Sequence, residues 1–497
     1  MASTSSGASG QTSGIATVRA APQTAELGQT QLRAGALGLV PAIMQSVTLI
    51  APAVAATFFL PFITGYAGVT TPLAYPLGFL ITLGLGLMLV QLAKHFPSAG
   101  GYFTYLSRTL HPRVGFLGAW LMTFYVPTVG GPITAYFGFI LHNELKTNFG
   151  LNVPWWIAPL VLLPIIAFLA YRGITVSTRL IVLFGLAEMA IVLALAVWGL
   201  FDPGKGGFNV DSFNPANITS VSGFGLAVVF SVQAFTGWDG AAPLAEETAQ
   251  PRRNVPRAVI GSILILGVFL VFVEWGIMVG WGTKAVASIP TSAEFPALVL
   301  AHRFWGAAWI FMLLALFSSV MAVSQAANNV STRMWFGMAR TGVLPRPFSD
   351  VHPTYKTPVN TILLQFVLSV ICGLGFGLWL GPDVAFFLLQ GLMLVIAVIF
   401  VYSLANVGVM WYYWRERRDE FNWFMHGVIP VVTTAALMLV LYESFNPPPA
   451  PPYSYGPWIV AAWVLLSAAI MLIMNRRGRE QWLMRAGAIV ADAEAPA

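Results

Sequence analysis

The residue types best suited to binding a small charged solute lie between Phe235 and Ala258, in the stretch FTGWDGAAPLAEETAQPRRNVPRA. The stretch begins inside an apolar segment of membrane-spanning length. There Thr236, Trp238 and Asp239 stand among glycines where a helix should run unbroken. Small residues and a carboxylate at membrane depth are costly in lipid, so they indicate a cavity lined by protein. A carrier of solutes needs such a cavity, whereas a simple membrane anchor does not.

Asp239 is the strongest single candidate for a ligand. An ionised carboxylate is expensive in a low-dielectric site, so we expect Asp239 to bind a substrate amine directly or to carry a proton. The alternative is a structural role, because Asp commonly caps the start of a helix. The two roles are compatible.

The first apolar segment has a matching weak point at Ala51-Pro52-Ala53. Pro52 cannot donate a backbone hydrogen bond and clashes with the preceding turn, so the helix should stop near Ile50 and restart near Val54. The restart leaves free N–H groups at the positive end of a half-helix, where an anion such as a substrate carboxylate is favoured. A kink tolerated by neighbouring helices is the alternative.

Carbonyl groups at the two interruptions would accept hydrogen bonds from an ammonium group or a cation. A carboxylate-binding end beside an amine-binding end is the geometry that an α-amino acid requires. The predicted substrate-binding residues are Ile50, Ala51, Ala53, Val54, Ala55, Ala56, Gln233, Phe235, Thr236, Trp238 and Asp239.

Four further polar residues lie inside apolar segments. Glu188, in LFGLAEMAIVLAL, is a candidate for proton or ion coupling, and the alternative is a buried acid bonded to a neighbouring backbone. Glu274 lies nearer one end of its segment and is more typical of a structural or vestibular acid. Ser318 and Ser319 could offer oxygens to a sodium ion, although such serines more often bond their own helix.

The composition places the chain among polytopic membrane proteins. Of its 497 residues, 57% are hydrophobic and 9% are charged, whereas soluble domains are about a quarter charged. The net charge of +6 does not indicate nucleic acid binding, because the basic residues lie in short loops between apolar runs. With Cys372 as its single cysteine, the chain can form no disulfide framework, and we expect no disulfide-linked partner.

The sequence lacks the motifs of zinc proteases, P-loop nucleotidases and α/β-hydrolases. We therefore expect neither an enzyme nor a bound cofactor or metal, and transport would run on an ion gradient, of protons or of sodium.

Apolar runs of about 20 residues predict twelve membrane-spanning helices. They are 36–64, 72–94, 114–141, 155–171, 175–201, 222–249, 257–281, 306–337, 358–379, 383–414, 424–443 and 457–474. Residues 1–35 and 476–497 are predicted to be tails, the first of them disordered. With these spans, 21 basic residues fall on the side of the N-terminus and 4 on the other, together the 25 of the chain. The excess predicts that both termini are cytoplasmic.

The layout of the spans suggests an internal repeat. The first and sixth spans, and the second and seventh, are separated by nearly the same number of residues (36 to 222, and 72 to 257). Five spans separate the copies, and an odd number inverts the second copy in the membrane. Interrupted helices at matching positions of inverted halves are a pointer to a binding site near the middle of the bilayer.

Three stretches resemble the amino acid–polyamine–organocation superfamily of secondary transporters. Residues 237–258 are similar to its signature of a Gly-aromatic-acid step, an acidic pair and a loop rich in Pro and Arg. Residues 97–120 (PSAGGYFTYLSRTLHPRVGFLGAW) resemble its loop between helices 2 and 3. Residues 328–345 (NNVSTRMWFGMARTGVLP) resemble the end of its helix 8.

The resemblance covers roughly residues 36–475. It implies an all-α, leucine-transporter-like fold of two inverted five-helix repeats, at about 36–201 and 222–414, with extra helices at 424–474. It also implies alternating access around helices 1 and 6, and a plasma-membrane permease, here of a bacterium, for amino acids or related amines, working as a proton symporter.

The resemblance also assigns roles by position. Asp239 falls where many members have a Glu that senses or moves protons, and Gln233 and Phe235 fall at positions that gate or line the pocket. The family's Gly-Ser-Gly in helix 1 is replaced by Val54-Ala55-Ala56, which implies a tighter or differently shaped pocket. Glu188 falls near a Lys of some proton-coupled members, and an acid there could bind sodium or accept a proton.

Other functions fit the same residues. A polyamine or amino-alcohol permease or exchanger would use Asp239 as a direct ligand and rely less on the helix 1 amides. A sodium-coupled carrier, a channel and a nutrient sensor built on a transporter scaffold are further alternatives.

Overall fold

The computed structural model describes residues 32–446 and 448–476, leaving out the side chains of 124–127. The described residues form helices and no strand, apart from one isolated parallel bridge between Leu37 and Thr248. The two predicted tails lie almost wholly outside the described residues.

The α-helices are α2 (Leu39–Ile50), α3 (Pro52–Thr57), α4 (Leu60–Ala67), α5 (Thr71–Ala93), α6 (Tyr102–Thr109), α7 (Pro112–Phe149), α8 (Ile157–Tyr171), α9 (Ile174–Phe201), α10 (Val221–Ala234), α11 (Pro251–Trp281), α12 (Pro296–Trp305), α13 (Ile310–Arg340), α14 (Val359–Val370), α15 (Phe376–Leu380), α16 (Pro382–Phe386), α17 (Leu394–Arg415), α18 (Ile429–Glu443) and α19 (Gly456–Arg476). Short 3₁₀ turns join several of them, including η1 (Gly68–Thr70) and η4 (Ala242–Glu247). The π-helical segments are η8 (Ile371–Gly375), η9 (Phe387–Met393) and η11 (Phe424–Val428).

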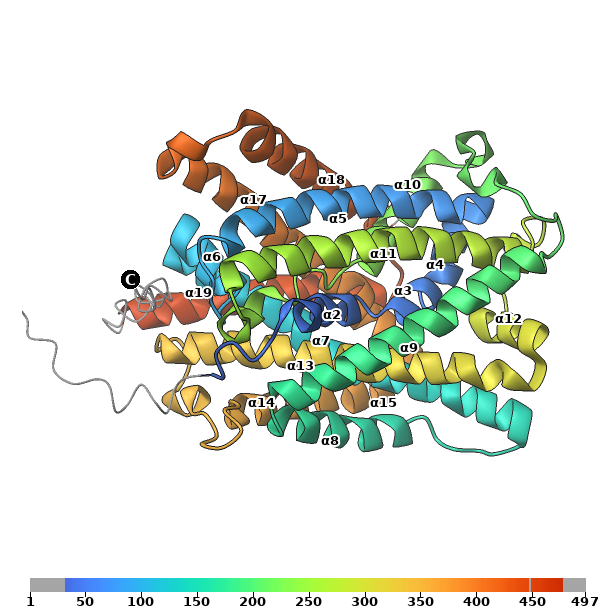
Figure 1. The fold of residues 1–497 in the computed structure, drawn as a ribbon, viewed down its shortest axis with the longest axis horizontal. Helices are drawn as coiled ribbons and strands as arrows, with labels where there is room; N and C mark the ends of the chain where they lie inside the picture. The colour runs from blue at the N-terminus through green and yellow to red at the C-terminus, as the bar shows by residue number, and fades with distance from the viewer. Residues whose placement is uncertain (1–31, 447, 477–497) are drawn as a thin grey trace, which may run out of the picture.

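The long helices run side by side along the horizontal direction of Figure 1. Within the described residues, ten helical segments are long and apolar enough to cross a membrane. Two shorter apolar helices, α8 and α10, lie at the positions of the predicted fourth and sixth spans. The count of twelve spans and the inverted repeat stay predictions.

The boundaries of the first two predicted spans differ from those in the structure. The helical segments are Leu39–Thr57 and Leu60–Ala93, so the end of the predicted first span joins the second. The join is the 3₁₀ turn η1, which begins at Gly68 with φ 56° and connects α4 directly to α5.

The first span is interrupted at Ala51, as the sequence predicts. Helix α2 ends at Ile50, and Ala51 adopts left-handed angles (φ 62°, ψ 76°) before α3 begins at Pro52. The restart comes two residues earlier than predicted, because the fixed φ of proline suits the first position of a helix. A non-glycine residue with positive φ costs of order 1–3 kcal/mol and persists only where the surrounding structure enforces it.

The sixth span is interrupted as well. Helix α10 ends at Ala234 and is followed by turns through Gly237, whose φ is 120°. The chain resumes as the 3₁₀ helix η4 at Ala242, close to the predicted restart near Ala241. The second half of this span is thus one short 3₁₀ segment before α11 begins at Pro251.

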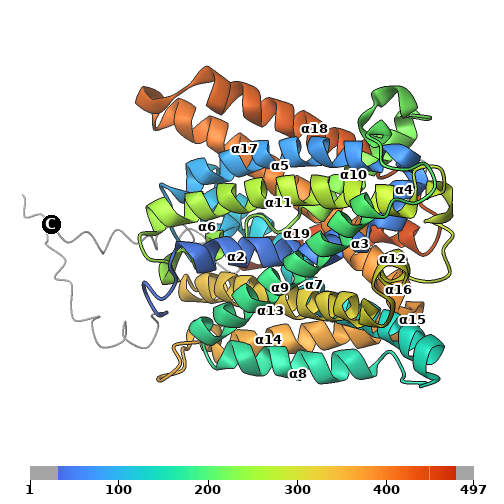
Figure 2. The same cartoon turned by 45° about the vertical axis from the view of Figure 1, so that its right-hand side comes forward.

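The two interruptions touch each other at the centre of the bundle. A Cβ atom on Gly237 would lie 2.6 Å from the carbonyl carbon of Leu49 and 2.8 Å from the amide nitrogen of Ile50. Beyond the turn, the Ala241 N–H donates to the Ser46 hydroxyl at 3.0 Å. Figures 1 and 2 show α2 and α3 in the middle of the bundle, with α9, α11 and α13 packed around them.

We predict that Gly237→Ala strongly destabilises the protein. The added methyl group would collide with backbone atoms, and L residues rarely adopt this φ, so the loss should be about 3 kcal/mol or more. Thermal unfolding of the purified protein in detergent measures it. Gly150→Ala is the matched control, because Gly150 also has positive φ (68°) but nothing within 4 Å of the added atom, and it should cost about 1 kcal/mol. Equal losses would contradict the close approach.

Candidate functional site

Asp239 lies within the turn that interrupts the sixth span, and its side chain is buried. The Tyr402 hydroxyl of α17 donates to its Oδ2 at 3.4 Å. Its Oδ1 has no hydrogen-bond partner among the described residues. The carboxylate therefore keeps one acceptor in the interior for a proton or for a donor from outside the chain.

Aromatic rings surround this carboxylate. The Trp238 ring lies 5.2 Å from the ring of Tyr402, which lies 5.7 Å from that of Tyr102 on α6. Tyr102 also lies close enough to Asp239 to hydrogen-bond with it, and Tyr105 of α6 is a further neighbour of Tyr102 at 6.0 Å. A carboxylate among aromatic faces is a chemically suitable site for an ammonium group.

The expected free amides at the restart of helix 1 are occupied by groups of the protein itself. The Ala53 N–H donates to Glu188 Oε2 at 3.0 Å, and the Val54 N–H approaches the Ser319 hydroxyl at 3.4 Å. The Ala55 N–H donates to the Ala51 carbonyl at 2.7 Å. The prediction of free amides at Ala53, Val54 and Ala55 is therefore wrong for this conformation.

The Ala51 carbonyl was likewise expected to be free, and it accepts the Ala55 N–H instead. The helix restarts at Pro52, so residues 51–55 already close one regular helical turn. Ala56 lies inside α3, and Ile50 is the last residue of α2.

Glu188 reaches helix 1 because α9 packs closely against α2. One turn earlier, a Cβ atom on Gly185 would lie 2.6 Å from Thr48 Cγ2 and 2.7 Å from Met44 Cε, so glycine permits this approach. Glu188 lies on the buried face of α9 and is fully buried, with Oε1 unpartnered among the described residues. The alternative weighed for it, an acid bonded to a neighbouring backbone, describes its geometry here.

The two serines of α13 behave differently. Ser318 donates to the Ala315 carbonyl of its own helix at 2.9 Å, which is the structural alternative. Ser319 lies beside both Val54 and Glu188. Glu274 is fully buried next to Tyr75 of α5, away from the solvent-exposed position that a vestibular acid would have.

Three of the remaining predicted residues lie beside a small cavity. Its lining includes Gln233, Thr236, Trp238 and Tyr402, and its volume is about 20 Å³, which is room for about one water molecule. Phe235 is fully buried and packs against the rings of Tyr75 and Phe79 instead. A solute therefore enters only if the helices around the interruptions move.

Gln233 connects the sixth span to α7 through a π-helical segment. Its Nε2 donates to the Gln390 carbonyl in η9, and Gln390 Nε2 donates to Thr128 Oγ1 at 2.9 Å. π-Helical segments inside α-helices occur frequently at functional sites. This series of hydrogen bonds could not be predicted from the sequence, because no pattern pairs residue 233 with residue 390.

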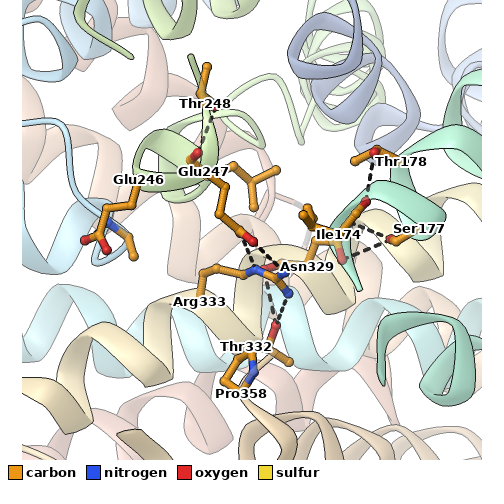
Figure 3. A network of polar contacts seen from close by, with 12 residues as sticks. Ile174, Ser177, Thr178, Glu246, Glu247, Thr248, Asn329, Thr332, Arg333 and Pro358 are labelled. Atoms are coloured by element: carbon orange, nitrogen blue, oxygen red, sulfur yellow. Dashed lines mark hydrogen bonds and ion pairs between the residues drawn. The ribbon is translucent and has the colours of Figure 1, made fainter. Parts of the chain in front are cut away.

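A buried ion pair fixes the second half of the sixth span. Figure 3 shows Arg333 of α13 against Glu247 of η4. Arg333 Nε donates to Glu247 Oε2 at 2.8 Å, its Nη2 to Oε1 at 3.3 Å, and its Nη1 to the Thr332 hydroxyl at 3.0 Å. Both side chains are buried. The count of basic residues places Arg333 on the side of the N-terminus, and the structure places its side chain inside the bundle, within the predicted eighth span.

The same end of the sixth span is held on two more sides. Glu246 accepts from the Ala99 amide at 2.9 Å and pairs with Arg340. The Leu37 N–H donates to the Glu247 carbonyl at 2.9 Å, which ties the segment before α2 to η4. The bundle is thus closed at this end.

Aromatic packing closes the other side of the interruption in helix 1. Phe58, which follows α3, lies 4.8 Å from the ring of Tyr136 on α7, 5.5 Å from Phe386 on α16, and 5.6 Å from Phe295. With polar contacts at one end and aromatic contacts at the other, the interruptions are enclosed from both sides.

We predict that Glu247→Leu and Arg333→Met each cost about 3–5 kcal/mol, because each leaves a buried charge unpaired. The double variant should recover most of the loss, since well-packed apolar residues can replace a buried pair. Thermal unfolding of the four proteins in one detergent tests this. A double variant whose loss equals the sum of the single losses would show that the two side chains act independently.

Comparison with known proteins identifies the family of this chain. The model of a family described as amino acid permease matches residues 37–473. The low-affinity putrescine importer PlaP of Escherichia coli is 25% identical over 433 residues, covering 82% of this chain and 89% of the relative. The serine/threonine exchanger SteT of Bacillus subtilis is 25% identical, covering 60% of this chain and 67% of the relative. The branched-chain amino acid permease BcaP of Bacillus subtilis is 26% identical, covering 63% and 69%.

These relatives are all transporters, and they are named for different substrates. The match of the family model over most of the length assigns the family, and the apolar helical bundle is consistent with it. The chain is an integral membrane protein of the amino acid permease family.

Proposed function

We propose that this protein is a secondary active transporter that moves an amino acid or a related amine across the plasma membrane, with both termini in the cytoplasm. In this proposal residues 36–475 form one transport domain, with inverted repeats at about 36–201 and 222–414 and extra helices at 424–474. Neither a cofactor nor a metal takes part.

The observation that carries the proposal is the contact between the two interruptions, with a buried carboxylate beside it. Asp239 offers an unpartnered oxygen at a point where two helices lack regular hydrogen bonding. Irregular backbone at membrane depth is tolerated where it is buried in protein or lines a cavity. A binding site for a small solute would account for both the unpartnered carboxylate oxygen and the irregular backbone.

Enclosure of the site from both sides supports alternating access as the mechanism. The pairs formed by Arg333 and Glu247, and by Arg340 and Glu246, would break to open the cytoplasmic end. The aromatic contacts of Phe58 would separate to open the opposite end. Because these groups are on different sides of the interruptions, one set can open while the other stays closed.

We propose protons as the coupling ions. Asp239 and Glu188 are buried carboxylates on the two sides of the interruptions, and each has one unpartnered oxygen that can take a proton. Ser319 beside Glu188 leaves sodium coupling as a second candidate, because hydroxyl and carboxylate oxygens also suit a hard cation.

A polyamine or amino-alcohol permease is the second candidate for the cargo. Its support is the carboxylate and aromatic surroundings of Asp239, together with the putrescine importer among the relatives. An exchanger would use the same site without net coupling to a gradient.

We predict that Asp239→Asn abolishes uptake driven by a pH gradient while the protein still inserts and folds. The amide keeps the shape of the side chain but can neither accept a proton nor balance an ammonium charge. Uptake of radiolabelled amines and amino acids into proteoliposomes, with an acidic exterior and potassium replacing sodium, measures the effect. Asp419→Asn, at an exposed loop position, is the control. Normal pH-dependent uptake by Asp239→Asn would remove this residue from the mechanism.

A further inference from the structure

The buried charges inside the bundle are strongly unbalanced. Among the described residues, the buried acids are Glu144, Glu188, Asp239, Glu247 and Glu274. The buried basic side chains in the same part of the chain are Arg333, which is paired with Glu247, and His426, whose Nδ1 accepts from the Asn422 amide and which is therefore a neutral imidazole. An isolated charge in a low-dielectric interior is very costly unless it is paired. The interior therefore offers partners for a cation and no free cationic side chain for a carboxylate.

Backbone amides could in principle bind a carboxylate without a basic side chain, as the start of a half-helix does. In this protein Glu188 supplies the oxygen that the Ala53 amide bonds, at 3.0 Å, and Ser319 lies at the Val54 amide. A carboxylate on the cargo would find these donors taken. It would also lie beside Glu188 Oε1, which is an additional acceptor without a partner among the described residues.

Three of the unpartnered groups around the interruptions are acceptor oxygens, and the Tyr105 hydroxyl near Asp239 is a further one that can donate or accept. Glu188 Oε1, Asp239 Oδ1 and Gln233 Oε1 are buried oxygens without a hydrogen-bond partner in the described part of the chain. An ammonium group has three donors and no acceptor, so it complements such a set. The rings of Trp238 and Tyr402 near Asp239 add faces that attract a cation.

We propose that the cargo is an organic cation with an ammonium group and without a carboxylate, and that Glu188 excludes α-amino acids by filling the amide site of helix 1. This inference rests on the proposed transport function and selects among its substrates. The acid acts as a built-in replacement for the carboxylate that an amino acid would bring.

Matched pairs of amino acids and their decarboxylated products test the inference. The pairs are lysine with cadaverine, ornithine with putrescine, and arginine with agmatine, which differ only by the carboxylate. Each compound competes with the same radiolabelled amine for uptake by wild-type protein in proteoliposomes. Each amine should compete at a concentration lower than its amino acid by about tenfold or more, because an unpaired buried carboxylate loses at least one charged hydrogen bond.

Substitution of Glu188 tests whether this residue, and not another part of the site, causes the preference for amines. Glu188→Ala removes the carboxylate that accepts from the Ala53 N–H, so this amide becomes available to a cargo carboxylate. The preference for each amine over its amino acid should then fall by about tenfold. Glu188→Gln keeps an oxygen that can accept from the Ala53 N–H, so it should reduce the preference for amines less than Glu188→Ala does. The ratio within each pair is the readout, so a uniform loss of activity does not imitate the effect.

Three outcomes would overturn the inference. One is that, in the wild-type protein, each amino acid competes for uptake as well as its amine does. This outcome would contradict the inference but not the proposed transport function. Another is an unchanged ratio in a folded Glu188→Ala variant, which removes Glu188 as the cause. A third is that the radiolabelled amine is not taken up at all, in which case the inference fails, whereas uptake of a neutral amino acid would still support the transport function. The wild-type comparison decides the matter even if Glu188→Ala does not fold.

Discussion

The backbone contact between Gly237 and the Leu49–Ile50 peptide is the constraint on which the site depends. It leaves no room for a Cβ atom, so the sixth span must turn away from helical geometry where the first span does. The left-handed angles of Ala51 lie on one side of this contact, and the turns around Trp238 lie on the other. Because they face each other, the polar groups released by each interruption are brought into one enclosed region.

Each interruption is stabilised by side chains of other helices, and α13 contributes to both. On the side of helix 1, Glu188 and Ser319 supply oxygens to the amides of the restarted helix. On the side of the sixth span, Ser46 bonds the Ala241 amide, and Arg333 holds Glu247. The amides at the restart of helix 1 are therefore hydrogen-bonded by the protein itself without a ligand. Three of the open positions beside the interruptions are acceptor oxygens, which favours a cargo rich in hydrogen-bond donors.

The positions of most helices and of the two interruptions could be predicted from the sequence, because they depend on local patterns. Apolar runs located the spans, Pro52 located the first interruption, and the Gly237-Trp238-Asp239 cluster located the second. The partners of those residues could not be predicted in the same way. That Glu188 bonds the Ala53 amide and Tyr402 bonds Asp239 depends on helix packing between residues far apart in the chain. A glycine one turn before Glu188, which permits close packing, was the signal that could have suggested the first contact.

The most direct test of the account is a density map of the protein in a lipid nanodisc with saturating cadaverine. The account predicts helical hydrogen bonding interrupted at Ala51 and again around Trp238, with ligand density between the interruptions and an ammonium group within hydrogen-bonding distance of Asp239. Continuous helices through both positions, or ligand density elsewhere in the bundle, would contradict it.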